Sequence, residues 1–434
     1  MKCINCGTEN NLKERTANQG RCKQCQHPFV FEPTAMGNIK ITDPMFAKVI
    51  AEISANNTLF FTPKQLLYFL DNRLKAKSFK LSGFGCLYIF FNIWVTGFFG
   101  GILSSIFSSD NFWLIINLIY QVCVIIYLYN QTKSTKLSYV SRQASAKALR
   151  VIGTLILVVG ILTSLFVLNS FIVFVIVVIL GILSIYLGTR QIDRNKSTQE
   201  FLISQSQFQA WLDKWQQFNG SSPKILPSAR EELAPATINP DVTAYSFDRL
   251  VVCDSSTIAQ FLIANNFHFE NNCAILSITG YPQSIFATTM EMLRRNPDLQ
   301  VYALHDCSPR GMNLVNHLRS SDAWFLNSNV TIIDVGLLPR QIIATQRGMF
   351  IQTSPESAQD AKQLAVNVRQ TLTTEELAWL DSGNFVELES FTPQRLIKVL
   401  QRGIAGSRDL ATDDSNLMII GDAGSDIYAV ESFG

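Results

Sequence analysis

Residues 151–189 read VIGTLILVVGILTSLFVLNSFIVFVIVVILGILSIYLGT, and this stretch contains no charged side chain. Asn169 and Ser170 interrupt it near its middle and leave an apolar segment on each side. A helix needs about 17–25 residues to cross the hydrocarbon core of a bilayer. Each segment is long enough, so the stretch predicts two transmembrane helices, 150–168 and 171–188, joined by a short turn.

Two more apolar segments precede this pair. Residues 81–109 and 111–132 are also free of charge, with Asp110 between them, and they predict helices over 83–106 and 111–130. Buried helices of a soluble core are the alternative, but segments this long do not suit it. We therefore expect a four-helix transmembrane block at 81–188.

The transmembrane block accounts for the composition of the chain. Only 16% of the 434 residues are charged, against about 25% in an ordinary soluble protein, and the shortfall lies in these segments. The composition excludes a purely soluble enzyme, a disordered chain and a disulfide-rich secreted module. The net charge of +2 does not by itself indicate a nucleic-acid partner.

Basic residues indicate how the block is oriented. They flank the spans on one side, while the two hairpin tips carry none, and cytoplasmic loops are the ones enriched in Lys and Arg. Both termini are therefore expected in the cytoplasm. The basic residues that carry this argument are Arg73, Lys75, Lys77 and Lys80, then Lys133, Lys136, Arg142, Lys147 and Arg150, and finally Arg190, Arg194 and Lys196.

The interiors of the four spans contain no Asp, Glu, Lys, Arg or His; Asn92, Asn117 and Gln121 are their sizeable polar groups. Transporters and proton relays usually keep ionisable groups at membrane depth. The block is therefore interpreted as an anchor and packing surface rather than a conduit. Gly97, Gly100 and Gly101 could permit close helix approach, although glycine is also common in membrane helices generally.

Four cysteines near the N-terminus form two CxxC pairs, Cys3 with Cys6 and Cys22 with Cys25. Two such pairs at this spacing suit four thiolates around one Zn²⁺, so residues 1–33 are predicted to be a zinc ribbon. A four-thiolate site is closed and hence structural. Two disulfides are the alternative, but they belong to exported proteins, and no signal peptide precedes Cys3.

The segments on either side of the transmembrane block are helical by pattern. Residues 40–80 predict two short helices, as in a helix-turn-helix or winged-helix fragment or in a hairpin on the membrane surface. Residues 189–245 hold an amphipathic aromatic helix near 198–218 and a proline-rich linker. The aromatic face of that helix could lie at the membrane interface, pack on the globular domain or mediate self-association.

From about residue 246 to residue 434, short apolar runs alternate with helical segments. The runs at 250–253, 274–278, 301–304 and 330–335 predict strands of a mostly parallel sheet covered on both faces, and thus an α/β domain. Cys253-Asp254 and His305-Asp306 follow two of these strands, where functional groups of such sheets usually lie. The acidic tail around a short strand at 417–420 is interpreted as a solvated turn.

Several ordered blocks of this domain resemble the Toprim domain of the topoisomerase VI A subunit and its meiotic double-strand-break relatives. The run 384–404, with Val386-Glu387-Leu388-Glu389, is similar to the C-terminal segment of that family. Residues 61–69, FTPKQLLYF, resemble its winged-helix segment, which implies that Tyr68 corresponds to the nucleophilic tyrosine. The other matching blocks are Leu250–Phe261, Gly280–Pro282, Val301–Arg319 and Ile333–Ile342.

The sequence departs from this family at the metal site. The resemblance implies a Glu after the first strand and an Asp-x-Asp after the third, which together hold Mg²⁺. Cys253 stands at the Glu position with Asp254 one residue later, and the Asp-x-Asp reads Asp306-Cys307-Ser308. A thiol is a poor ligand for Mg²⁺, so Asp254, Asp306 and Ser308 are interpreted as a vestigial magnesium site. The arginine that precedes the family's tyrosine is replaced by Lys64 or Gln65.

Three functions follow from these features. The first is a membrane-anchored, non-catalytic binding module with a degenerate Toprim-like domain that contacts nucleic acid. The second is a metal-dependent phosphodiester-cleaving enzyme with a rearranged site, whose catalytic candidates are Tyr68, Asp254 and Asp306. The third is a structural membrane protein that recruits protein partners. Zn²⁺, the lipid bilayer, nucleic acid, other proteins and a second copy of the chain are the cofactor and partners considered.

Overall fold

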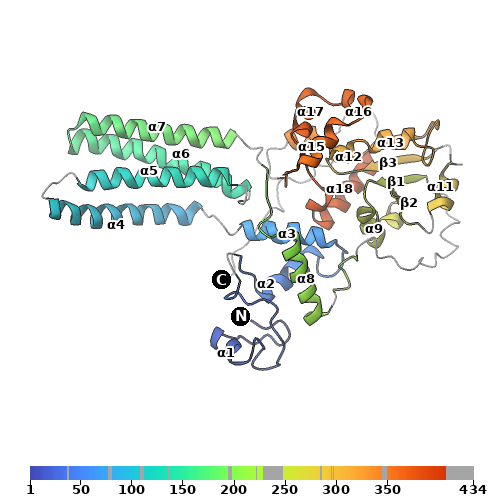
Figure 1. Ribbon diagram of the computed structural model, residues 1–434, viewed down its shortest axis with the longest axis horizontal. Coiled ribbons are helices and arrows are strands. Elements are labelled where there is room, and N and C mark those ends of the chain that lie inside the picture. The colour runs from blue at the N-terminus through green and yellow to red at the C-terminus, as the bar shows by residue number, and fades with distance from the viewer. Residues whose placement is uncertain are drawn as a thin grey trace. The chain divides into compact units, whose positions relative to one another are not determined.

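The computed structural model of the chain is shown in Figure 1, and its elements keep the labels of that figure throughout. It describes residues 1–36, 39–76, 81–107, 112–134, 137, 139–193, 198–220, 222–227, 248–283, 286–294, 296, 298–344 and 349–406. Most of the proline-rich linker and the expected strand at 417–420 lie outside these ranges. The chain forms two compact units. We call Met1–Asp71, Ile203–Thr345 and Met349–Gly434 the globular unit, and Asn72–Leu202 the helical unit.

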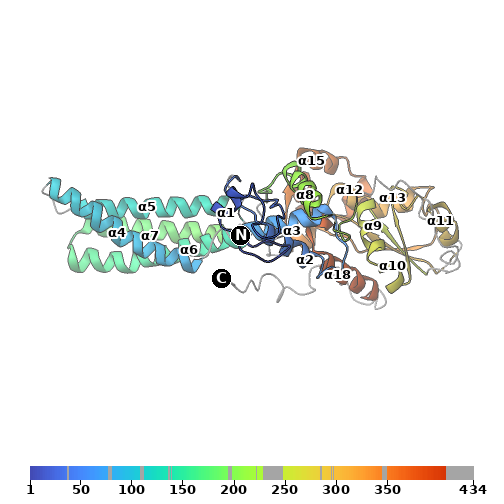
Figure 2. The same cartoon turned by 90° about the horizontal axis from the view of Figure 1, so that it is seen from below.

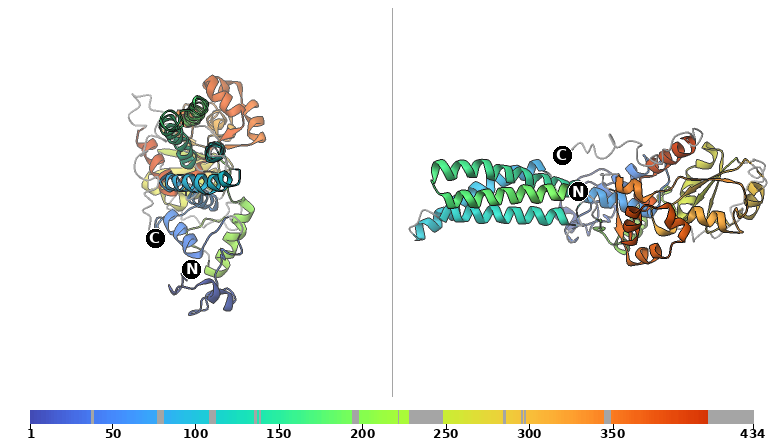
Figure 3. Two further views of the ribbon diagram at one scale, coloured as in Figure 1. Left: turned by 90° about the vertical axis from the view of Figure 1, so that its left-hand side faces the viewer. Right: turned by 90° about the horizontal axis from the view of Figure 1, so that it is seen from above.

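The helical unit is built from four long helices that lie side by side (Figures 1 and 3). All four are long and apolar enough to cross a membrane. The third one begins well before the predicted residue 150, because the basic segment that precedes the apolar run is itself helical. The four helices are α4 (Leu81–Phe107), α5 (Phe112–Lys133), α6 (Tyr139–Leu162), which continues as a π-helical turn over Thr163–Val167, and α7 (Phe171–Asp193).

Glycines bring α6 and α7 into close contact. A Cβ atom on Gly153 would lie 2.9 Å from the carbonyl oxygen of Gly181 and 2.8 Å from Cγ1 of Ile185. Gly188 faces the carbonyl oxygen of Ala146 in the same way. The Ser184 hydroxyl donates a 2.8 Å hydrogen bond to the Leu149 carbonyl across this contact. Small residues let backbones approach where the hydrophobic effect cannot drive association.

Helices α4 and α5 are joined by polar side chains. Tyr88 donates a 2.7 Å hydrogen bond to Gln121, and the Asn117 amide donates to Asn92 and Thr96 at 3.3 and 3.0 Å. These groups therefore satisfy one another and act as helix–helix contacts. Of the glycines considered on α4, only Gly100 is in a close approach, against the backbone of Trp113; nothing lies within 4 Å of a Cβ on Gly97 or Gly101.

The N-terminal part of the globular unit packs around an aromatic cluster. Phe31 lies against Phe46 on α2 and against Trp211 and Trp215 on α8, with ring centroids 5.1 to 6.1 Å apart. The amphipathic helix thus buries its apolar face within this unit, which is one of the three placements considered for it. The helices here are α1 (Leu12–Ala17), α2 (Asp43–Ile53), the part of α3 (Pro63–Ala76) up to Asp71, and α8 (Gln205–Asn219).

The centre of the globular unit is a four-stranded sheet in the order β2-β1-β3-β4, and all its pairings are parallel. Alternate residues face opposite sides: Val251 and Cys253 enter one core, and Leu250 and Val252 the other. The predicted parallel sheet with two covered faces is therefore confirmed. The strands are β1 (Arg249–Cys253), β2 (Cys273–Ser277), β3 (Gln300–Leu304) and β4 (Thr331–Asp334).

Helices cover both faces of this sheet (Figure 2). Residues of α9 (Ser256–Ala264), α14 (Pro339–Ala344) and α18 (Pro393–Gly406) belong to one core, and those of α11 (Phe286–Arg294) and α13 (Leu314–Ser320) belong to the other. A two-stranded antiparallel ribbon, β5 (Gln352–Thr353) with β6 (Asn384–Phe385), follows the sheet. The remaining helices are α10 (Phe267–Glu270), α12 (Pro309–Met312), α15 (Pro355–Lys362), α16 (Val366–Thr371) and α17 (Thr374–Asp381).

The end of β6 places the segment 386–391 beside the sheet. Cys307 and Val386 exchange backbone hydrogen bonds of 3.0 Å in each direction. This bridge holds the segment next to the loop that follows β3. The carboxyl ends of β1 and β3, where Asp254 and Asp306 lie, therefore have Glu387 and Glu389 as neighbours.

Candidate functional site

The four N-terminal cysteines come from two similar turns. Gly7 follows Cys6 with φ +74°, and Gln26 follows Cys25 with φ +57°. Left-handed backbone is thus needed at the same point of both turns, where glycine is the favoured residue. The turns also share a backbone hydrogen bond, from Cys3 N–H to Thr8 and from Cys22 N–H to His27, each 2.9 Å.

The geometry of the cysteine cluster fits one tetrahedral metal ion. All four sulfur atoms lie within 4.8 Å of one another, with Cys3–Cys25 at 3.7 Å and Cys6–Cys22 at 3.6 Å. Bonds of about 2.3 Å to a tetrahedral Zn²⁺ separate the sulfurs by about 3.8 Å. His27 contacts Asn219 through Nε2 at 2.9 Å and is not one of the clustered ligands.

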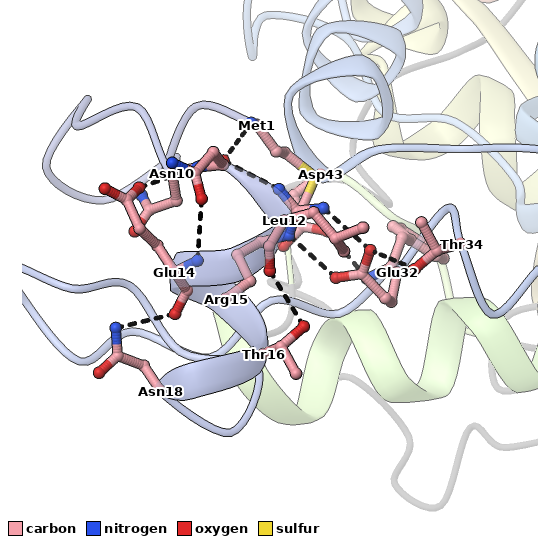
Figure 4. A network of polar contacts seen from close by, with 12 residues as sticks. Met1, Asn10, Leu12, Glu14, Arg15, Thr16, Asn18, Glu32, Thr34 and Asp43 are labelled. Atoms are coloured by element: carbon pink, nitrogen blue, oxygen red, sulfur yellow. Dashed lines mark hydrogen bonds and ion pairs between the residues drawn. The ribbon is translucent and has the colours of Figure 1, made fainter.

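Polar side chains on and around α1, among them Asn10, Arg15 and Glu32, form a network of hydrogen bonds and ion pairs (Figure 4). Asn10 donates to the sulfur of Cys22 at 3.5 Å and accepts the backbone N–H of Lys23 at 2.9 Å. Arg15 donates to both carboxylate oxygens of Glu32 at 2.9 Å and to the Asn10 carbonyl at 2.8 Å. Asn10 thus contacts one of the clustered sulfur atoms from outside the cluster, an arrangement that is common around metal sites.

The carboxylates that the sequence predicts as a vestigial magnesium site lie at the ends of β1 and β3. Asp254 Oδ2 accepts the backbone N–H of Asp306 at 2.8 Å, and Asp306 Oδ1 accepts the backbone N–H of Leu388 at 2.6 Å. Burial raises the pKa of both side chains above its ordinary value, although these N–H groups oppose the rise. The structure thus brings the two aspartates together, but backbone donors occupy one oxygen of each.

The other positions of the family's metal site serve the fold. Cys253 is fully buried in the core beneath the sheet. Ser308 caps α12, where its hydroxyl oxygen accepts the Gly311 N–H at 3.1 Å. One metal ion can be shared by three or more His, Cys, Asp or Glu side chains when these lie close enough together. Among the described residues, the four cysteines meet this condition. The aspartates alone do not form such a group.

Tyr68 lies against this edge of the sheet and contacts Glu387. Its hydroxyl donates a 2.6 Å hydrogen bond to Glu387 Oε2, and the same hydroxyl accepts a hydrogen bond from the Gln352 amide. Phe350 packs edge-on against the ring of Tyr68, and Tyr68 is only 1% exposed. Burial and the negative charge of Glu387 hold the pKa of Tyr68 well above its ordinary value.

Two more side chains of the 60–68 segment contact Glu387 and Glu389, which we call the acidic run 387–389. Lys64 Nζ is 2.6 Å from Glu387 Oε1, and the Thr62 hydroxyl donates to Glu389 at 2.7 Å. Burial would lower the pKa of Lys64, but Glu387 and the nearby carboxylates raise it overall. Sequence reasoning used Glu387 and Glu389 only as part of a family resemblance and assigned them no place in the site.

His305 has a partner that sequence reasoning did not find. Its Nε2 lies 3.0 Å from Asp334 Oδ1, and its Nδ1 lies 2.8 Å from the Asp306 carbonyl. A ring nitrogen can approach a carbonyl oxygen only as a donor, so Nδ1 carries a proton. Burial would lower the pKa of His305, but Asp334 and the carbonyl overcome this and raise it to about 9. His305 is therefore an imidazolium at neutral pH.

Comparison with known proteins identifies the α/β part of the chain. Residues 250–396 match the Toprim domain family of the topoisomerase 6 A subunit and Spo11. The matched residues include β1 from Leu250 onward, β2 to β4, and the acidic run 387–389. No curated protein matches the chain. The resemblance expected from the sequence is thus confirmed for this domain.

Proposed function

We propose that this protein, which carries a Toprim domain at residues 250–396, is a membrane-anchored binding module that contacts nucleic acid and does not cleave it. One observation carries the proposal. The residues at the family's catalytic positions are committed to internal contacts: Tyr68 to Glu387, and Ser308 to the cap of α12. A nucleophile and a metal site both need free oxygen atoms.

The environment of Tyr68 opposes its use as a nucleophile. Attack on a phosphodiester requires a base to take the phenolic proton and requires access to the oxygen. Glu387 could accept that proton, but it already pairs with Lys64. The pKa of Tyr68 is raised, so the neutral phenol is favoured over the phenolate that would attack. Its contacts are those of a buried tyrosine whose hydroxyl is satisfied by hydrogen bonds.

Nucleic acid is proposed as the ligand because exposed arginines flank the carboxyl edge of the sheet. Arg310 and Arg340 each follow a proline at the start of a short helix, α12 or α14. Both side chains are exposed, and Arg310 is 86% exposed in its ion pair with Asp360. Arginine at such positions suits sequence-independent contact with phosphates.

The proposal also covers the cysteine cluster and the four helices of the helical unit. We propose that the cysteine cluster holds a structural Zn²⁺, and that α4 to α7 anchor the protein with both termini in the cytoplasm. The basic residues around the spans support this orientation. Labelling of single cysteines with an impermeant reagent tests it: Lys147→Cys should react from the cytoplasmic side and Asn169→Cys from the opposite side. Labelling of both from one side contradicts the topology.

Fluorescence anisotropy of labelled duplex DNA with full-length protein in detergent tests the ligand. We expect binding without a divalent cation, with an affinity that falls steeply as salt rises. Arg310→Ala and Arg340→Ala should each weaken binding and reduce the salt slope by about one. Lys48→Ala, an exposed lysine on α2, is the matched control and should change nothing. No binding at low salt overturns the proposal in favour of protein partners.

A further inference from the structure

Negative charge accumulates at the carboxyl edge of the Toprim sheet. Asp254 and Asp306 lie at the ends of β1 and β3, and Glu387 and Glu389 lie beside them. Four carboxylates in a partly buried site are costly unless cations or protons neutralise them. A metal ion supplies that charge in an ordinary carboxylate site of this kind.

Burial raises the pKa of Asp254 and the charge of His305 opposes that rise, but His305 shares its charge with a carboxylate outside these four groups. Its ring is held between the Asp334 carboxylate and the Asp306 carbonyl, so its charge is already opposed by a fifth carboxylate. Among the described residues, Lys64 supplies the ammonium that contacts the acidic run. Its Nζ lies 2.6 Å from Glu387 Oε1. The Lys64 charge also interacts with Glu389 and Asp306.

The backbone on either side of Lys64 is fixed at several points. Phe61 pairs with the 224–226 segment through two 3.0 Å hydrogen bonds. The Phe60 N–H donates to the Asn265 side chain at 2.8 Å. After Lys64, the Gln65 amide donates to the Phe391 carbonyl at 3.2 Å. These contacts, together with Thr62–Glu389 and Tyr68–Glu387, hold the ammonium against the acidic run.

We infer that the Lys64 ammonium is a built-in counter-ion at the Toprim edge, where it replaces a divalent cation and excludes Mg²⁺ and Mn²⁺. A divalent cation next to Glu387 would have to approach a fixed positive charge and would have to displace it. Removal of the ammonium leaves the carboxylates without it, and carboxylate oxygens are the ligands that a hard divalent cation prefers. Within the described part of the chain, these carboxylates are not close enough together to share one ion as they stand, so the cation would have to draw them together once the ammonium is gone. The inference deepens the proposed function, since it explains how the domain keeps its acidic edge without metal.

Mn²⁺ binding followed by electron paramagnetic resonance tests the inference on full-length, zinc-saturated protein in detergent. The wild type and Lys64→Arg, which keeps the charge, should show no saturable binding. Lys64→Met, which keeps the apolar stem, should gain saturable Mn²⁺ binding, and Lys64→Met/Asp306→Asn should lose that gain. Saturable binding to the wild type that Asp306→Asn abolishes overturns the inference, as does a folded Lys64→Met without any gain.

A second measurement uses the wild type alone, so it does not depend on the folding of a variant. A carbodiimide activates a carboxyl group as an O-acylisourea, and a lysine amine in contact with it loses its proton, displaces a urea and forms an amide. The reagent should therefore link Lys64 to Glu387, which are 2.6 Å apart. Excess Mn²⁺ should leave the yield unchanged. No link, or a link that Mn²⁺ suppresses, overturns the inference. Failure here is distinct from failure of the proposed function, because DNA binding is measured without divalent cations.

Discussion

The Tyr68 hydroxyl donates a 2.6 Å hydrogen bond to Glu387 across a separation of 319 residues in the sequence. The two residues belong to the same compact unit, although the whole helical unit is inserted between them in the chain. The contact therefore joins the two sides of the insertion. It also occupies the hydroxyl that the family resemblance associates with strand cleavage.

The first prediction concerns the energetic role of this hydrogen bond. Tyr68→Phe should lower the free energy of unfolding of the globular unit by about 1–3 kcal/mol, because Glu387 remains partly buried with one contact fewer. Tyr127→Phe, at a residue that is 50% exposed, should leave it unchanged. Chemical denaturation followed by tryptophan fluorescence measures both. Equal stability of the Tyr68 variant and the wild type would contradict a structural role for the hydroxyl.

The cysteine cluster gives the second prediction. Purified protein should contain one zinc ion per chain, and Cys22→Ser should lose it, because a structural four-thiolate site needs all its ligands. The ribbon should then unfold and expose Trp215, which stacks on Phe31, to solvent. Elemental analysis and tryptophan emission report these changes. Cys86→Ser, at an exposed cysteine of α4, should keep its zinc; equal zinc content in the two variants would exclude the assigned ligands.

The third prediction follows from the buried His305. Its pKa is raised to about 9 in the folded protein, above an unfolded value of about 6.5. The folded state therefore retains its proton longer as pH rises. The contribution of the ion pair with Asp334 is fully present below pH ~6.5 and is lost as pH rises through ~9.

Urea denaturation at a series of pH values measures this dependence. His305→Asn should remove stability on the order of 3 kcal/mol at pH ~6 and should flatten the curve between pH ~6.5 and ~9. His317→Gln on α13 is the control and should retain the wild-type slope. A wild-type curve that rises across this interval would show that His305 is neutral in the folded protein.

The fourth prediction compares two glycines of the helical unit. Gly153→Ala should destabilise the α6–α7 pair, because the new Cβ would lie 2.9 Å from a backbone carbonyl that cannot move independently. Gly97→Ala meets nothing within 4 Å and should be neutral or stabilising by up to about 1 kcal/mol, since alanine favours helices. Thermal unfolding in one detergent should therefore show a clear loss for the first variant and none for the second. Equal losses in the two variants would exclude the glycine contact between α6 and α7.

Sequence patterns predicted the elements whose signals are local. Long stretches without charged residues predict α4 to α7, and short apolar runs predict β1 to β4. The spacing of Cys3, Cys6, Cys22 and Cys25 predicts the cysteine cluster. The same reasoning placed Asp254 and Asp306 at the ends of strands that prove to be adjacent. Each of these inferences needs only a short stretch of chain and the general geometry of helices and sheets.

Contacts between distant segments carry no local signal. Asp334 ends β4 and meets His305 only because β4 pairs with β3. Glu387 meets Lys64 and Tyr68 because a two-residue bridge at Cys307 and Val386 sets the path of the chain. Glycine is common in membrane helices, so the sequence does not distinguish Gly153, which packs against α7, from Gly97, which faces open space.

Strand cleavage is the most direct test of the central claim. Supercoiled plasmid is incubated with full-length protein in detergent and millimolar Mg²⁺ or Mn²⁺, and the reaction is stopped with a denaturing detergent to trap covalent protein–DNA adducts. The account predicts salt-sensitive DNA binding with no nicked or linear product and no adduct. Divalent-dependent cleavage with an adduct that Tyr68→Phe and Asp306→Ala both abolish would contradict it.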